Sequence, residues 1–198
     1  YAKSKINFEK YLSKKNNKSI EIIILRFSTA CGSSFRTRFD LVLNDFVYSA
    51  LNFNQINILS DGSPLRPLID VRDMANALIW ASFKRFNEPL TILNTGLINC
   101  NYSIKELAFE VKKAIPKVKI NINLKAEKDN RSYKVDFKKF EEISEGKVLR
   151  YDIQESIQTL ISLIKNNDLK GDMKNFFRLH TLKDLIKKNQ IDKNIKFK

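Results

Sequence analysis

The chain of 198 residues is long enough for one domain of ordinary size, or for part of a larger one. Its hydrophobic share of 43 %, with 14 Phe and 6 Tyr, can build a sizeable core. No apolar run approaches the roughly 18 residues of a membrane-spanning helix, so we expect no membrane partner. Two cysteines, Cys31 and Cys100, do not make a disulfide framework and favour the reduced thiols of a cytoplasmic protein.

The formal net charge of +14 raises the question of nucleic-acid binding. The excess is mostly lysine, which is spread along the chain and mixed with acidic residues. No arginine-rich stripe and no nucleic-acid motif accompanies it. We therefore expect no nucleic-acid partner, and a basic nucleic-acid binder stays open only as an alternative.

Hydrophobic periodicity predicts a helix at the start of the chain, followed by a strand. The helix is predicted over residues 1–15. Its predicted buried positions are Ile6, Phe8, Tyr11 and Leu12. The strand is predicted over residues 19–27, and its continuous apolar centre is typical of a parallel strand buried on both faces.

The rest of the chain continues to alternate between the two patterns. Further helices are predicted over residues 39–51, 73–86, 104–114, 137–143, 153–165 and 179–188. Further strands are predicted over residues 56–59, 68–71, 90–94 and 118–124. Asp73 is the expected N-cap of one helix, and Ser103 with Glu106 forms the capping-box pattern of another. Strands that alternate with helices indicate an α/β fold.

Tyr1 and Lys5, in the segment YAKSK, have a spacing that suits acid–base chemistry. On a helix they lie one turn apart, with about 6 Å between β-carbons. A tyrosine is a useful acid or base only if its phenol ionises near neutral pH. An ammonium about 4 Å away favours the phenolate by on the order of 4 kcal/mol at an effective dielectric constant of about 20. The pair alone is weak evidence, because Tyr11 and Lys15 form a second one.

Three further segments follow this pair in order. The first strand ends in LRF at residues 25–27 and leads to a loop with CGS at residues 31–33. The segments DGSPLRPLIDVRD at residues 61–73 and DNRSYKVDFKK at residues 129–139 come later. In order and spacing, these motifs resemble the extended short-chain dehydrogenase/reductase family, and within it the NAD-dependent nucleotide-sugar epimerases and dehydratases.

The resemblance implies a fold and a division of the chain. The expected fold is α/β, the C-terminal part of a Rossmann-like doubly wound fold plus a small α/β substrate-binding lobe. Residues 1–35 would be a remnant of the NAD-binding Rossmann domain, with the catalytic helix and the following strand. Residues 36–198 would form mainly the substrate-binding lobe, with residues 67–95 returning to the Rossmann sheet. The chain would begin at the catalytic tyrosine of a longer, homodimeric protein.

The resemblance also implies roles for individual residues. Tyr1 would be the catalytic acid/base at a sugar hydroxyl, and Lys5 would hold the nicotinamide ribose and favour the phenolate. The implied cofactor-binding residues are Tyr1, Lys5, Phe27 and Ser28. The implied substrate-binding residues are Thr29, Arg38, Asn44, Arg66 and Arg131. The last two would bind the nucleotide diphosphate, which the planar guanidinium fork suits.

The expected cofactor is NAD or NADP, the expected substrate is a nucleoside-diphosphate sugar, and no metal site is indicated. The five glycines do not form Gly-x-x-Gly-x-x-Gly, so the 198 residues alone are expected to be inactive. Arg66 is followed by Pro67, and Asp70 stands where the family usually has His, which leaves the sugar and the choice of epimerase or dehydratase open. The alternatives are an NAD(P)H-dependent keto-sugar or carbonyl reductase, and a non-catalytic scaffold that keeps the fold.

Overall fold

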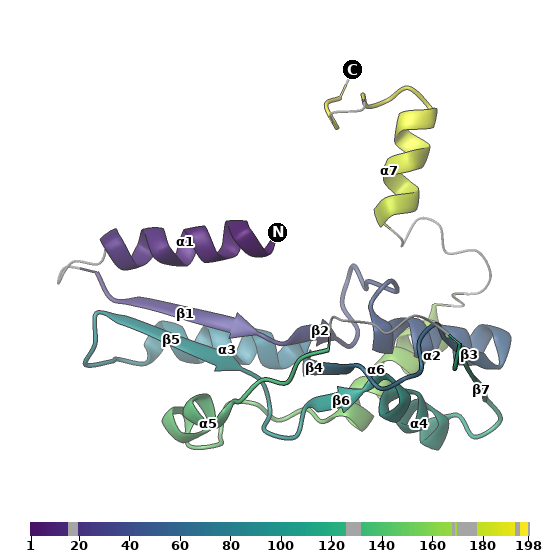
Figure 1. Ribbon diagram of the computed structural model, residues 1–198, viewed down its shortest axis with the longest axis horizontal. Coiled ribbons are helices and arrows are strands. Elements are labelled where there is room, and N and C mark those ends of the chain that lie inside the picture. The colour runs from purple at the N-terminus through teal and green to yellow at the C-terminus, as the bar shows by residue number, and fades with distance from the viewer. Residues whose placement is uncertain (16–19, 126–131, 168, 170–177, 193–194, 198) are drawn as a thin grey trace. The chain divides into compact units, whose positions relative to one another are not determined.

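The computed structural model describes residues 1–15, 20–125, 132–167, 169, 178–192 and 195–197 (Figure 1). Its helices are α1 (Ala2–Lys15), α2 (Val42–Phe53), α3 (Val71–Phe83), α4 (Ile104–Ala114), α5 (Lys138–Ser144), α6 (Ile153–Asn166) and α7 (Arg178–Lys187). Its strands are β1 (Ile22–Phe27), β2 (Thr29–Cys31), β3 (Gln55–Ile58), β4 (Leu65–Asp70), β5 (Leu90–Thr95), β6 (Asn101–Ser103) and β7 (Lys119–Ile122). None of the helices within the described residues combines the length and the hydropathy needed to span a bilayer.

The described residues divide into two compact units. The first unit takes its residues from Tyr1–Ala30, Leu65–Tyr102 and Tyr133–Tyr151. The second takes its residues from Cys31–Pro64, Ser103–Ser132 and Asp152–Lys198. Residues 133–151 thus pack with the first unit, although the family resemblance places them in the substrate-binding lobe.

The first unit is organised by a parallel strand pair. β1 and β5 pair in register from Ile22 with Leu90 to Phe27 with Thr95, so both strands end at the same edge. The helix α3 packs against β1, and α5 packs against β5. One residue after β1 ends, the chain enters β2, which belongs to a three-stranded sheet in the order β2-β4-β6. In this sheet β4 runs directly into α3.

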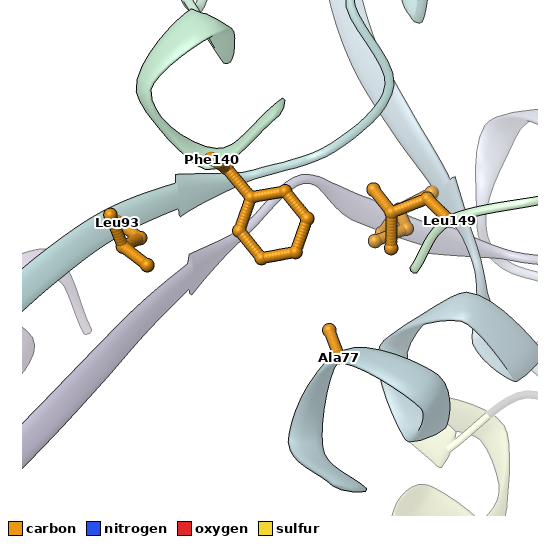
Figure 2. Packing of buried hydrophobic residues seen from close by; sticks show 5 residues of the cluster. Ala77, Leu93, Phe140 and Leu149 are labelled. Carbon is orange, nitrogen blue, oxygen red and sulfur yellow. The ribbon is translucent and has the colours of Figure 1, made fainter. Parts of the chain in front are cut away.

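Phe140 is the centre of the core of the first unit. Its side chain is fully buried, and Figure 2 shows its ring between Leu93 of β5 and Leu149, above Ala77 of α3. The ring of Trp80 approaches it edge-on, with 5.2 Å between ring centroids. The core therefore joins β5, α3 and the later α5 segment into one packing unit.

Phe140→Ala should destabilise the protein by about 3–5 kcal/mol, because it removes a fully buried ring and leaves a cavity among its neighbours. The free energy of unfolding in urea measures the effect. Phe83→Ala is the matched control, because Phe83 is 81 % exposed on α3 and its loss should change the stability by less than about 0.5 kcal/mol. Equal effects of the two substitutions would contradict this placement of the core.

The second unit is built on α2, α4 and α6, which pack against one another, and on the parallel pair of β3 and β7. The start of α4 is fixed locally. The Ser103 hydroxyl accepts a hydrogen bond from the Glu106 backbone N–H at 3.1 Å, and the Glu106 carboxylate accepts one from the Ser103 backbone N–H at 2.7 Å. The predicted capping box is confirmed. Asp152 and Glu155 form the same arrangement at the start of α6.

The cap of α4 should weaken in acid. The hydrogen bond from the Ser103 backbone N–H, with that from its hydroxyl, lowers the pKa of Glu106. Because the folded pKa is below the unfolded one, the contribution is present above the unfolded pKa of about 4.3 and is lost as pH falls through the folded value. Glu106→Gln should cost about 0.3–1 kcal/mol near neutral pH, and the difference should shrink towards about pH 3 in urea unfolding. A difference that stays constant over this range would contradict the cap.

The predicted burial of the first helix is wrong. Ile6, Phe8 and Tyr11 are 53 %, 58 % and 54 % exposed, and α1, all of which is described, has no buried residue. Periodicity identifies an apolar stripe but not the surface that covers it. In this structure α1 is joined to β1 by an ion pair between Glu9 and Arg26.

The prediction that the first strand is buried on both faces is also wrong. The residues of β1 are partly buried, apart from exposed Arg26. The helix α3 packs against the strand, whereas α1 buries none of its own side chains. The continuous apolar run therefore led to a prediction of greater burial than the residues of β1 have.

Asp73 is not the N-cap of its helix. The helix α3 begins two residues earlier, and the side chain of Asp70 caps it by accepting a hydrogen bond from the Arg72 backbone N–H at 2.8 Å. Asp73 is fully buried and accepts hydrogen bonds from the backbone N–H groups of Arg150 at 3.0 Å and Tyr151 at 2.9 Å. Its carboxylate fastens a distant segment to α3, which the local sequence does not reveal.

Candidate functional site

The shared end of β1 and β5 is the edge that the chemistry of the first unit would use. The two strands finish with the pair Phe27 and Thr95, and the backbone N–H of Ser28 donates to the Thr95 carbonyl at 3.1 Å. In α/β sheets, ligands bind beyond the carboxyl ends of parallel strands. Phe27 packs against the core, and Ser28 is 9 % exposed. Two of the predicted cofactor-binding residues therefore lie at this edge.

The helix α1 begins on the side at which β1 ends (Figure 1). The tie between the two elements is the Arg26 guanidinium, which donates to the Glu9 carboxylate through Nε at 2.9 Å and through Nη2. This hydrogen bonding lowers the pKa of Glu9 and raises that of Arg26. Because Glu9 lies opposite Arg26 near the end of β1, the preceding turns, with Tyr1 and Lys5, extend towards the carboxyl edge of the strand.

Tyr1 and Lys5 are one helical turn apart, as predicted from their spacing. The Lys5 backbone N–H donates to the Tyr1 carbonyl at 3.2 Å, and the Lys5 Nζ lies 5.5 Å from the centroid of the Tyr1 ring. Tyr1 is 96 % exposed. Lys15 lies 6.0 Å from the ring of Tyr11 in the same way. The local geometry does not distinguish the two pairs. Tyr1 and Lys5 lie on the part of α1 that extends from Glu9 towards the carboxyl end of β1, whereas Tyr11 and Lys15 lie on the opposite side of Glu9.

Thr29 and Arg66 lie on adjacent strands of the three-stranded sheet. Thr29 begins β2, and Arg66 lies in β4, its neighbour in the order β2-β4-β6. Arg66 is half-buried, and its Nη1 donates to the Leu65 carbonyl at 2.8 Å. Two predicted substrate residues that are far apart in the sequence thus lie on neighbouring strands of one sheet, and their contact with a substrate stays a prediction.

Arg38 and Asn44 belong to the second unit. The Asn44 side chain is 2 % exposed; its Oδ1 accepts from the Gly32 N–H at 3.1 Å, and its Nδ2 donates to the Arg38 carbonyl at 3.0 Å. The Arg38 guanidinium makes two hydrogen bonds to Asp40, at 3.0 Å and 2.6 Å, which raise its pKa. Asn44 therefore holds the loop over residues 32–38. Arg131 lies outside the described residues.

Asn44→Ala should destabilise the protein by about 1–3 kcal/mol, because it leaves buried backbone groups of Gly32 and Arg38 without these hydrogen bonds. Urea unfolding measures the loss. Asn57→Ala is the matched control: Asn57 is exposed on β3, and its amide oxygen accepts from Asn121 at the surface. A similar effect of both substitutions would show that the amide of Asn44 does not hold the loop.

The sequence did not indicate a functional role for Gly96, Asn101 or Phe137. Gly96 and Phe137 lie next to Ser28 at the ends of the strands, and Asn101 binds the segment before Phe137. Gly96 follows the last residue of β5. A glycine directly after a strand is an ordinary turn signal, so the sequence carries no specific sign of the close contacts at Gly96. Phe137 comes from a segment about forty residues later, and no local pattern reveals its position.

Comparison with known proteins places the fold. Residues 1–96 match the model of the NAD dependent epimerase/dehydratase family. An NAD-dependent NDP-hexosamine 5,6-dehydratase involved in tunicamycin biosynthesis matches with a TM-score of 0.69 and 19 % identity, over 85 % of this chain and 55 % of that one. The UDP-glucose 4-epimerase of Bifidobacterium longum, solved with NAD+ and UDP, gives 0.68 and 18 %, over 85 % and 55 %.

The UDP-glucose 4-epimerase of Thermotoga maritima, solved with UDP-glucose, gives a TM-score of 0.69 and 18 % identity, over 84 % of this chain and 53 % of that one. At such identities the likeness concerns the fold. It confirms the expected Rossmann-like α/β class. The chain spans about half the length of these solved proteins.

Proposed function

We propose that this chain, whose residues 1–96 match the model of the NAD-dependent epimerase/dehydratase family, is part of an enzyme that epimerises or dehydrates a nucleoside-diphosphate sugar. The observation that carries the proposal is the placement of Tyr1 and Lys5, one turn apart, before the carboxyl edge of β1. The similarly folded proteins include both epimerases and a dehydratase, and several were solved with NAD or a UDP-sugar.

The residues at this edge fit the ribose and nicotinamide end of NAD or NADP. Lys5 offers ammonium donors for ribose hydroxyls, and Phe27 and Ser28 are fixed at the end of β1 by the core and by the Thr95 carbonyl. NAD, when bound, supplies the acceptor and the donor of a hydride. Its pyrophosphate requires a glycine loop at a helix N-terminus, and the five glycines of this chain do not form one. We therefore propose that the 198 residues alone are inactive.

In this proposal Tyr1 is the acid/base. Its phenolate oxygen removes the proton of a sugar hydroxyl and returns it at the end of the cycle. The ammonium of Lys5, one helical turn from Tyr1, is the proposed donor to the ribose hydroxyls. The exposure of Tyr1 in this chain leaves its hydroxyl open to a substrate.

Arg66 is the proposed contact to the diphosphate of the substrate. A guanidinium presents two parallel N–H donors to phosphate oxygens and remains charged at every physiological pH. Thr29, on the strand next to that of Arg66, is the proposed hydroxyl contact to the sugar. Arg38 and Arg131 are further proposed substrate residues, and Asn44 is proposed to act on the substrate only through the loop that it holds. A homodimer is proposed for the whole protein.

Tyr1→Phe should lower kcat by at least about 10²-fold in the protein that contains these residues, because it removes the proton acceptor without removing the ring. The assay follows conversion of UDP-glucose and related nucleotide sugars, together with absorbance of NADH. Tyr11→Phe is the matched control, since it changes the same kind of Tyr–Lys pair on the same helix and should leave kcat unchanged.

Each alternative has its own outcome in this assay. Net consumption of NADH with each turnover would indicate a carbonyl or keto-sugar reductase. Full activity of Tyr1→Phe would exclude the acid/base role. A wild-type protein that converts no nucleotide sugar and binds neither NADH nor NADPH would point to the scaffold and sink the proposed function.

A further inference from the structure

Gly96 lies where the first unit has no room for a side chain. A Cβ at this position would be 2.6 Å from the Ser28 Oγ, and 2.8 Å and 2.9 Å from Cε1 and Cζ of Phe137. Gly96 is not among the residues with positive φ, so its backbone conformation is open to alanine. The need for glycine at position 96 is therefore one of space.

Ser28, the nearest neighbour of Gly96, is held by several contacts. Its backbone N–H donates to the Thr95 carbonyl at 3.1 Å, and its hydroxyl donates to the same carbonyl at 3.3 Å. Its Oγ also lies 3.9 Å from the Sγ of Cys100. Burial raises the pKa of Cys100, which keeps this thiol protonated as a small packing group. A methyl group at position 96 would therefore press on a buried hydroxyl that is already hydrogen-bonded.

Phe137, the second neighbour, is 2 % exposed and comes from a segment that is fastened by side-chain amides. The Asn101 amide exchanges two hydrogen bonds with the backbone of Val135, at 2.9 Å and 3.0 Å, as a neighbouring strand would. The Nδ2 of Asn94 donates to the Asp136 carbonyl at 3.3 Å. The segment over residues 133–137 is thereby fixed to β5 and β6, and its last ring closes against Gly96.

We propose that Gly96 and Phe137 are positioning residues for Ser28, so that residues 133–137 support the link between β1 and β2 that, in the proposed function, lies beside the nicotinamide. The inference deepens the proposed function and rests on it. Neither residue is proposed to touch the cofactor; they act through Ser28. A methyl group at position 96 must displace either the Ser28 hydroxyl or the Phe137 ring, and a displaced Ser28 would then meet the cofactor in the wrong place.

The test measures NADH binding by fluorescence titration, in the protein that contains these residues. Gly96→Ala should weaken binding about tenfold or more, since small misplacements of positioning groups have effects up to about 10²-fold. Gly146→Ala is the matched control. Gly146 has φ of +63° and also belongs to the first unit, so this substitution strains the fold, yet it should leave the affinity for NADH unchanged.

Two further variants separate positioning from loss of stability. Gly96→Ala combined with Phe137→Leu should recover part of the affinity, because leucine lacks the two ring atoms closest to the new methyl group. Asn101→Ala, which introduces no steric clash, should weaken NADH binding several-fold by releasing Val135. Thermal unfolding of every variant is measured in parallel.

The outcomes are distinct. Wild-type affinity in Gly96→Ala, or an equal loss in Gly146→Ala, overturns the inference and leaves the proposed function standing. Unchanged affinity in Asn101→Ala overturns the part assigned to residues 133–137. A wild-type protein that binds neither NADH nor NADPH overturns the proposed function, and the inference falls with it.

Discussion

The parallel pairing of β1 with β5 is the constraint on which the arrangement of the first unit depends. Its register ends both strands together, at Phe27 and Thr95, and so places Ser28 and Gly96 side by side at one edge. A shift by one residue would turn every side chain of a strand to its other face. Half-buried Phe27 would then leave the core, and Ser28 would no longer lie opposite Thr95. The packing of Phe27 therefore fixes the register of β1, and the register fixes the positions of Ser28 and Gly96.

That packing is completed by a segment that arrives late in the sequence and is fixed at three points. Asn101 holds its start through Val135, and Phe140 fills the core in its middle. At its end, the buried carboxylate of Asp73 accepts backbone hydrogen bonds from Arg150 and Tyr151. A buried charge is costly without such partners, and these donors are available in only one position of the segment. The ring of Phe137 reaches Gly96 because the chain on both sides of it is held.

The features that the sequence predicted correctly are those with local causes. Ser103 and Glu106 are three residues apart and satisfy each other, so the cap of α4 could be recognised without its surroundings. Asp70 and Asp73 are equally plausible caps by residue type. The choice between them is made by backbone groups 77 residues further along the chain. The stripe on α1 fails for a related reason: periodicity shows that a helix has an apolar face, whereas burial depends on what the rest of the fold places against it.

The same distinction applies to the proposed catalytic pair. Tyr1 with Lys5 and Tyr11 with Lys15 have the same spacing and nearly the same distance between ammonium and ring, so side-chain chemistry alone gives them equal standing. They differ in their relation to β1. The ion pair of Glu9 with Arg26 ties the middle of the helix to the last part of the strand, which carries the first pair towards the edge and the second away from it. The proposed function therefore depends less on the motif than on the opposite directions of α1 and β1.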